Sequence, residues 1–335
     1  MILTHTNSVY SENIVLHDHV TYPQYVHQVS DGGMVVSRGI KMMPEELVNY
    51  TLAGKYNAAP GTREFITRLL DPSQKVGLIL SAGNTLWMGY DRNVQTSDIY
   101  PTHKLVTLGC TQVYAGYLAN SLGSFEYVST DATSCISGHS AWYTASMLLR
   151  LQELDAVVVI ATDSGTSEEN LHIFGEAKIS KLKDEENDPS VVKFRVGQGC
   201  NISVFESPAS LARTKNTALA KIQDIKVVSE HHNSPLGMSE GGVGYRTAMN
   251  AVTIKDINFV KTHGTFTSYN SVEEEIIRDL FGDIRIINYK LRIGHTMGAS
   301  TAVETALAIQ EESGTFLSLG AGMGNAFSSA VVEIY

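Results

Sequence analysis

One stretch of the chain, residues 132–161, restricts the fold more than any other. It opens with small residues at 132–138 that predict a turn, and from there to Leu154 apolar residues fall on every side of an expected helix. A helix that is apolar all round is a buried one. Residues 156–161 are apolar on both faces, which is typical of a strand in a parallel sheet covered on both sides. The stretch therefore predicts an α/β fold.

The rest of the chain alternates helix and strand in the same way. We expect further strands at 75–81, 201–206, 258–262 and 284–288, helices at 271–281 and 301–310, and a hairpin of 315–319 with 326–334. The second half resembles the first in outline, which indicates an internal duplication. We place the two halves at residues 1–206 and 207–335.

Composition narrows the class of protein. Apolar residues make up 43% of the 335 residues and charged residues 18%, so the chain can bury a large core. The net charge of −10, without a long Lys/Arg run, argues against a nucleic-acid partner. The sequence shows neither an apolar run long enough to span a membrane nor a signal peptide. Because the three cysteines are widely spaced and odd in number, we expect a reducing, cytoplasmic environment.

Cys135 directly precedes the expected buried helix. The unpaired N–H groups at a helix N-terminus carry partial positive charge, which lowers the pKa of a thiol and favours the nucleophilic thiolate. The alternative is an inert buried thiol, since free cysteines are commonly buried.

His263 and His295 each stand where an expected strand gives way to a turn, and functional sites collect at such places in α/β sheets. A core histidine that binds only backbone groups is the alternative for either residue. One cysteine and two histidines leave a tetrahedral zinc site short of a ligand. The pair His17 and His19 also lacks further ligands, so we expect no metal.

The glycine-rich segment at 320–325 lacks the Lys-Ser/Thr pair of a phosphate-binding loop. Glycines that let backbone N–H groups approach a reacting atom are the better interpretation, since an oxyanion hole needs such donors.

Taken in order, these segments resemble the β-ketoacyl synthases of the thiolase fold. The motifs are Ser134-Cys-Ile-Ser-Gly-His, Lys261-Thr-His-Gly-Thr-x-Thr267, Lys290-x3-Gly-His-x2-Gly-Ala299 and the terminal Gly-x-Gly-x-Gly-Asn325. The spacing of Lys290, His295 and Glu304 is similar to that of the elongating Cys-His-His branch. The resemblance implies a thiolase-like duplicated α/β/α/β/α layered fold.

The resemblance implies a decarboxylating condensing enzyme and a role for each residue. Cys135 would carry the acyl group as a thioester. His263 and His295 would stabilise the enolate that forms when a malonyl-type extender loses carbon dioxide. Lys290 and Glu304 would form a buried ion pair that supports the two imidazoles.

The resemblance also implies how substrate is held. The oxyanion hole would be formed by the backbone N–H groups of Cys135 and Ala321. Thr265 and Thr267 would hydrogen-bond the phosphopantetheine arm, and Gly320 and Gly322 would also bind substrate. No cofactor is implied beyond phosphopantetheine-linked acyl substrates. The implied partners are an acyl carrier protein or coenzyme A and, since the family's enzymes are dimers, a second copy or a synthase-like subunit. Carrier docking would need a basic patch, for which the candidates are Arg38, Lys41, Lys178, Lys181, Lys183 and Arg195.

The chain departs from the family where the acyl group would lie. Ala321 stands where a gating Phe is usual, Ile136 is larger than the usual Ala, and Phe266 and Ser271 also differ. We infer a divergent, shortened synthase of fatty-acid-like or polyketide and other specialised-metabolite biosynthesis. The alternatives are an acyltransferase or hydrolase on the same fold, and a non-catalytic synthase-like partner subunit.

Overall fold

The computed structural model describes residues 1–11, 34–36, 71–83, 111–164, 174, 179–181, 185, 188, 190, 193–235, 237–253, 256–265 and 267–335. The expectations for several residues lie outside these ranges, namely those for His17, His19, Arg38, Lys41, Lys178, Lys183 and Phe266.

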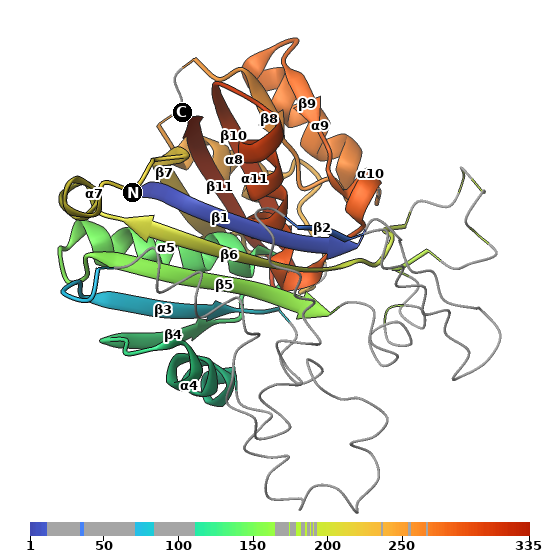
Figure 1. Ribbon diagram of the computed structural model, residues 1–335. Helices are drawn as coiled ribbons and strands as arrows, with labels where there is room; N and C mark the ends of the chain where they lie inside the picture. Colours follow the sequence, from blue (N-terminus) through green and yellow to red (C-terminus); the bar gives the residue numbers. More distant parts are fainter. Residues whose placement is uncertain are drawn as a thin grey trace, which may run out of the picture.

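The described strands form one 11-stranded mixed sheet, which runs through the molecule in Figure 1. In order across the sheet they are β4 (Tyr127–Asp131), β3 (Val76–Ser81), β5 (Ala156–Ser164), β6 (Gln198–Glu206), β1 (Ile2–Ser11), β7 (Ala220–Ser229), β11 (Ala326–Ile334), β10 (Thr315–Gly322), β8 (Phe259–Lys261) and β9 (Arg285–Ile287), while β2 (Met34–Val36) pairs with β1.

β1 joins the two halves of the sheet. It runs antiparallel to β6 over most of its length, and at Ile2 and Leu3 it also pairs with β7. The strands before it in the sheet order carry the first half of the chain, and those after it carry the second. The exact boundary of the halves at residue 206 stays a prediction.

The strand expected at 156–161 is the buried centre of the first half. β5 pairs in parallel with β3, as its pattern predicts, but it pairs antiparallel with β6. The parallel surroundings that the pattern indicates are therefore found on one side of β5 only. Both faces of β5 are nevertheless covered, because Val157 and Val159 belong to one apolar cluster and Val158 and Ile160 to another.

The helices of the described residues lie on both faces of this sheet (Figure 1). They are α4 (Thr111–Leu122), η5 (Ser134–Ile136), α5 (Ser137–Arg150), α7 (Pro208–Thr214), α8 (Val243–Ala251), α9 (Tyr269–Phe281), α10 (Lys290–Ile293), η6 (Met297–Ala299) and α11 (Ser300–Glu311).

The apolar clusters show the layers. One cluster joins α5 and α11 to strands of both sheet halves, so these two helices form a central layer. A second cluster packs α4 on the outer face of β3, β5 and β6. A third packs α8 and α9 on the outer face of β8, β10 and β11. The order helix, sheet, helix, sheet, helix is the layered arrangement that the sequence predicts.

The helix expected to reach Leu154 ends at Arg150. Gln152 then adopts a positive φ of 59°, which a helix cannot contain. The expectation that every side is buried was also wrong, since Met147 is 40% and Leu151 63% exposed. One face of α5 packs in the core and the other reaches the surface.

The duplication is visible in the backbone at the start of the two central helices. Each begins with a short 3₁₀ segment, η5 before α5 and η6 before α11. The first residue of each segment has positive φ, 55° at Ser134 and 49° at Met297. The two helices touch where a Cβ on Gly138 would lie 2.8 Å from the Ala302 nitrogen, so this crossing requires glycine.

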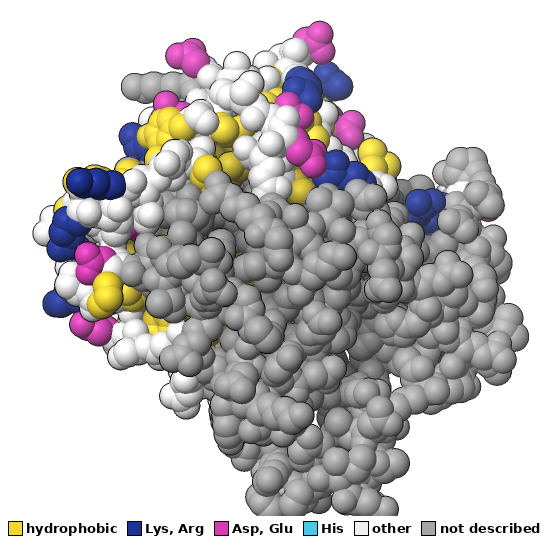
Figure 2. Space-filling view, in the orientation of Figure 1, with side chains coloured by type: hydrophobic (Ala, Val, Ile, Leu, Met, Phe, Trp, Pro, Cys, Tyr) yellow, Lys and Arg dark blue, Asp and Glu magenta, His cyan; other side chains and the backbone are white. Residues whose placement is uncertain are grey.

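Charges of both signs alternate on the described surface seen in Figure 2. Many are paired, as in Arg285 with Glu312 and Arg292 with Glu311. Among the helices that the structure describes, none combines the length and the hydrophobicity that a membrane crossing demands.

Candidate active site

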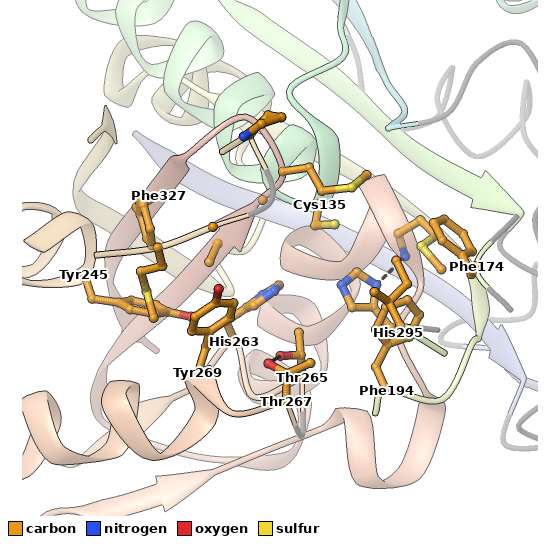
Figure 3. A pocket seen from close by; sticks show the side chains of 18 residues that line it. Cys135, Phe174, Phe194, Tyr245, His263, Thr265, Thr267, Tyr269, His295 and Phe327 are labelled. Atoms are coloured by element: carbon orange, nitrogen blue, oxygen red, sulfur yellow. Dashed lines mark hydrogen bonds between the residues drawn. The ribbon is translucent and has the colours of Figure 1, made fainter. Parts of the chain in front are cut away.

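A cavity of about 180 Å³ opens where the ends of the central elements meet (Figure 3). Its wall includes the predicted site residues Cys135, His263, Thr265, Thr267, His295, Ala321 and Gly322. Most of the remaining wall is apolar, with Phe174, Phe194, Met238, Tyr245, Met297 and Phe327. Segments from distant parts of the sequence thus share one small chamber with a thiol and two imidazoles.

Cys135 is the middle residue of η5, between the end of β4 and the start of α5. Its thiol lies 3.6 Å from the Ser134 hydroxyl oxygen. Burial raises the pKa of this thiol, while the hydroxyl of Ser134 and the charge of Lys290 act in the opposite direction. The sequence argument expected a lowered pKa, but in the structure desolvation outweighs the favourable groups.

The glycine-rich turn between β10 and β11 approaches Cys135 from the other side. A Cβ on Gly322 would lie 3.2 Å from the Cys135 nitrogen, and Ala321 also lines the cavity. Gly320 does not line it; a Cβ there would meet Ser328 and Thr301 at 2.6 Å. Gly320 thus serves close packing behind the turn rather than contact with a ligand.

His295 follows α10 and is 2% exposed. Its Nδ1 accepts the backbone N–H of Met297 at 3.0 Å and lies 3.3 Å from the Ser300 hydroxyl. Burial, together with the positive charge of Lys290, holds the pKa of His295 well below its usual range. Because a backbone N–H can only donate, the proton of the neutral ring is on Nε2.

His263 follows β8, and its ring stands 5.5 Å from the ring of His295 at 85°. Burial lowers the pKa of His263 well below its usual range, with Lys290 and His295 adding to the effect. Its Nδ1 is buried and has no hydrogen-bond partner among the described residues. A core histidine would have its ring nitrogen satisfied, so this ring is not explained by packing alone.

Lys290 and Glu304 form a buried ion pair behind the imidazoles. Lys290 Nζ lies 2.5 Å from Glu304 Oε1, and the two side chains are 2% and 0% exposed. Sequence reasoning missed a second lysine on the same carboxylate, since Lys261 Nζ lies 3.1 Å from Glu304 Oε2. The lysine is visible in the strand expected at 258–262, but nothing near it in the sequence indicates its partner Glu304.

Sequence reasoning also missed Glu273. Its carboxylate accepts the backbone N–H of His263 at 2.7 Å and that of Gly264 at 2.9 Å, which fixes the turn after β8. Glu273 shares the buried face of α9 with Ile276 and Ile277. The spacing i, i+3, i+4 places a glutamate on an apolar stripe, and this pattern was readable from the sequence.

Two threonines and a third histidine complete the surroundings. The hydroxyl oxygens of Thr265 and Thr267 lie 2.9 Å apart at the cavity wall. His139, one helical turn after Cys135, is buried in a hydrogen-bonded group with Ser328 and Thr305 and does not line the cavity. Within the described ranges no group of three metal-ligating side chains occurs.

Comparison with solved structures decides the fold. A β-ketoacyl synthase from Burkholderia phymatum STM815 matches with a TM-score of 0.73 at 13% identity, over 100% of this chain and 99% of that one. The chain has the β-ketoacyl synthase fold. A type II polyketide synthase assembly, an acyl-carrier protein in complex with its ketosynthase bound to the hexaketide, contains a chain with the same fold. That match has a TM-score of 0.66 at 17% identity and covers 79% of this chain and 80% of that one.

A curated relative supports the same resemblance in sequence. The 3-oxoacyl-[acyl-carrier-protein] synthase 2 of Rhizobium meliloti (strain 1021) is 28% identical over 200 residues, which cover 53% of this chain and 47% of that protein. The chain spans about half the length of this relative. No family model matches the chain. The predicted resemblance to β-ketoacyl synthases and the layered thiolase-like fold are confirmed.

Proposed function

We propose that the chain is a condensing enzyme, which joins an acyl group held on Cys135 to a malonyl-type thioester with loss of carbon dioxide. One observation carries the proposal: a thiol and two neutral imidazoles from three distant segments line one mainly apolar cavity.

The first step loads the acyl group. The sulfur of Cys135 attacks the carbonyl carbon of an acyl thioester, a new C–S bond forms, and the bond to the carrier sulfur breaks. Because burial raises the pKa of the thiol, its proton first passes to a neutral imidazole and then to the departing carrier thiolate. We assign the stabilisation of the oxyanion to the backbone N–H groups of Cys135 and Ala321, since the terminal turn lies against the nucleophile.

The second step makes the carbon nucleophile. The bond between the extender's carboxylate and its α-carbon breaks, carbon dioxide leaves, and the electron pair enters the thioester as an enolate. The Nε2–H of His295 can donate to the enolate oxygen, because Nδ1 is occupied by the Met297 N–H. His263 supplies the second contact from the opposite side of the chamber. The α-carbon then attacks the acyl carbon, and the bond between that carbon and the sulfur of Cys135 breaks. The Cys135 thiolate takes up a proton from solvent, because its original proton left with the carrier thiol.

The substrates follow from the cavity wall. Thr265 and Thr267 present hydroxyl groups that suit the amides and hydroxyl of a phosphopantetheine arm. The aromatic side chains of the cavity wall suit an apolar acyl group, and the small side chain of Ala321 on the same wall leaves more space than the usual Phe would. This fits a synthase of polyketide or fatty-acid-like biosynthesis that accepts a bulky acyl group.

An acyl carrier protein is the partner that we propose. A chain of the same fold comes from an assembly with an acyl-carrier protein. Since carrier docking needs positive charge, Arg195 and Lys181 are the described candidates, and Lys181 already donates to the Asp188 carbonyl at 3.2 Å. A dimer with a second copy or with a synthase-like subunit belongs to the same proposal.

The test is intact-mass analysis after incubation with acyl thioesters, with and without a malonyl thioester. Wild type should gain one acyl group and release carbon dioxide only when the extender is present. Cys135→Ala should not be acylated, whereas Cys200→Ala should behave as wild type, because Cys200 lies buried in β6. Acylation of Cys135→Ala would overturn the mechanism. Acyl transfer without extender-dependent carbon dioxide would indicate the acyltransferase or hydrolase alternative.

A further inference from the structure

Lys261 is a buried lysine at the centre of the site to which neither the motifs nor the mechanism assigns a role. It is the last residue of β8, two positions before His263, and its side chain is 0% exposed. Its ammonium group lies 3.1 Å from Glu304 Oε2 and donates to the Leu319 carbonyl oxygen at 2.8 Å.

The presence of a second lysine here requires an explanation. Burying an ammonium group is unfavourable unless it is paired, and an apolar side chain would suit this buried position of β8 as well. Glu304 already has a partner, because Lys290 binds its other oxygen. The carboxylate is thus held by one lysine on each oxygen. If either lysine is removed, the Glu304 carboxylate can rotate toward the lysine that remains.

The hydrogen bond to Leu319 links β8 and β10, two strands whose relative positions must stay fixed for the proposed reaction. β8 leads directly to His263, and β10 leads from Leu319 to Gly320 and Ala321 beside the nucleophile. The two strands are parallel neighbours in the sheet. Lys261 therefore connects the histidine strand, the glutamate of α11 and the turn proposed as the oxyanion hole.

We propose that Lys261 is a positioning residue of the condensing site, which clamps Glu304 opposite Lys290 and ties the Ala321 turn to the strand that carries His263. This inference rests on the proposed condensing function. Its second effect is electrostatic, since a fixed positive charge behind two imidazoles disfavours their protonation.

The charged groups around the two imidazoles determine how strongly Lys261 can lower the pKa values of the rings. The titratable groups around them on the surrounding elements are Lys261 on β8, Lys290 on α10, Glu304 on α11, Glu273 on α9, Asp163 on β5, His139 on α5, Cys135 on η5 and Tyr245 on α8. The set holds two lysines and three carboxyl groups. Lys261 and Lys290 both lower the pKa of His263 and of His295.

Two variants separate the tether from the charge. Lys261→Met removes both, whereas Lys261→Gln removes the charge and keeps a donor for the Leu319 carbonyl. Lys226→Met serves as a control, because Lys226 forms a partly exposed ion pair with Asp224 on β7. Each protein is labelled with ¹⁵N-histidine, and the ring signals of His263 and His295 are titrated by NMR alongside the pH profile of malonyl-thioester decarboxylation.

In Lys261→Gln we expect the pKa of both rings to rise by about one unit, which moves the acid limb of the decarboxylation profile upward by the same amount. Lys261→Met should show this shift and, in addition, a fall in kcat of about tenfold or more with little change in KM, because the turn loses its tether. Lys226→Met should match wild type in both measurements.

Unchanged ring titrations in both Lys261 variants that fold, judged by their chemical-shift dispersion, would overturn the electrostatic part, and an unchanged kcat would overturn the positioning part. The ring titration needs no turnover. If wild type fails to decarboxylate any malonyl thioester, the proposed function fails, while the ring shifts still report on Lys261.

Discussion

His295 Nδ1 accepts the backbone N–H of Met297 at 3.0 Å, and this single bond decides which way the remaining proton of the ring points. Met297 itself has a positive φ of 49°, which is unusual for a residue other than glycine. A strained residue in a functional site is held by its surroundings, here by the packing of Met297 against Phe194 and Phe174.

Replacing His295 by alanine should therefore remove one donor to the enolate. We expect extender decarboxylation to fall by about 10²- to 10³-fold, the usual effect of losing one such donor. Acylation of Cys135 should be retained, as measured by intact mass. His231→Ala, in an exposed turn, is the matched control and should leave both steps unchanged. A His295→Ala enzyme with normal carbon dioxide release would exclude this ring as an enolate donor.

The reactivity of Cys135 should depend on pH in a definite direction. Because burial raises the pKa of its thiol, alkylation by iodoacetamide should accelerate as the pH rises into the alkaline range. Lys290→Met removes a charge that lowers this pKa, so its alkylation profile should move to still higher pH. Peptide mapping measures the rate at Cys135. Cys200, whose pKa burial raises to about 12, should stay unlabelled in the folded protein. A Lys290→Met profile that moves to lower pH would contradict the assignment.

Ala321→Phe should reduce the size of acyl group that the enzyme accepts. Ala321 lines the cavity beside Cys135, so a phenyl ring there fills space that an acyl group would occupy. Loading of an acetyl thioester should change little, whereas loading of long or aromatic acyl thioesters should slow markedly. Time-resolved intact mass over a panel of thioesters measures both, and Ala321→Ser is the small control. Equal slowing across the whole panel would indicate a general distortion of the turn.

Gly138→Ala should destabilise the central helix pair. The added Cβ would lie 2.8 Å from the nitrogen and Cβ of Ala302, and such overpacking costs about 1–3 kcal/mol. The matched control is Gly116→Ala in α4, where a Cβ meets no atom within 4 Å and helix propensity favours alanine. The free energy of unfolding of both variants is measured by urea denaturation. A Gly138→Ala protein as stable as wild type would show that α5 and α11 can separate without loss.

Stability should fall as the pH drops below the value at which unfolded histidines titrate. Burial lowers the pKa of His139, His263 and His295, so the unfolded chain takes up protons below about pH 6.5 that the folded chain refuses. Asp131 and Glu273, whose pKa values burial raises, act in the opposite direction at more acidic pH. Urea unfolding from about pH 7.5 to about pH 5.5 measures the slope. A double variant, His263→Gln with His295→Gln, should flatten it, and a flat wild-type curve would contradict the prediction.

The site could be predicted from the sequence further than the fold could. Four short motifs named Cys135, His263 and His295, and the structure brings these residues to one cavity. Each motif is a local signal, because it places a reactive side chain where a strand or a turn ends. Lys261 was overlooked because a lysine in an apolar strand has no local meaning; its partner Glu304 is supplied by a helix 43 residues later.

The antiparallel step between β5 and β6 escaped prediction for a related reason. An apolar run shows that both faces of a strand are covered, but it does not show the direction of its neighbour. The end of α5 was misjudged because apolar residues continue past Arg150, where Gln152 turns the backbone out of the helix. The direction in which two strands pair and the residue at which a helix ends depend on tertiary contacts and backbone dihedral angles. A pattern of apolar residues does not specify either.

The strand that joins the two sheet halves has a consequence for how the protein is made. Residues 2 and 3 pair with residues 205, 206, 220 and 221, so β1 waits during synthesis for partners that are translated some two hundred residues later. Such distant pairings slow folding and leave an unpaired edge open to other chains in the meantime. A nascent chain of this design depends on protection of β1 until its partner strands β6 and β7 have been synthesised.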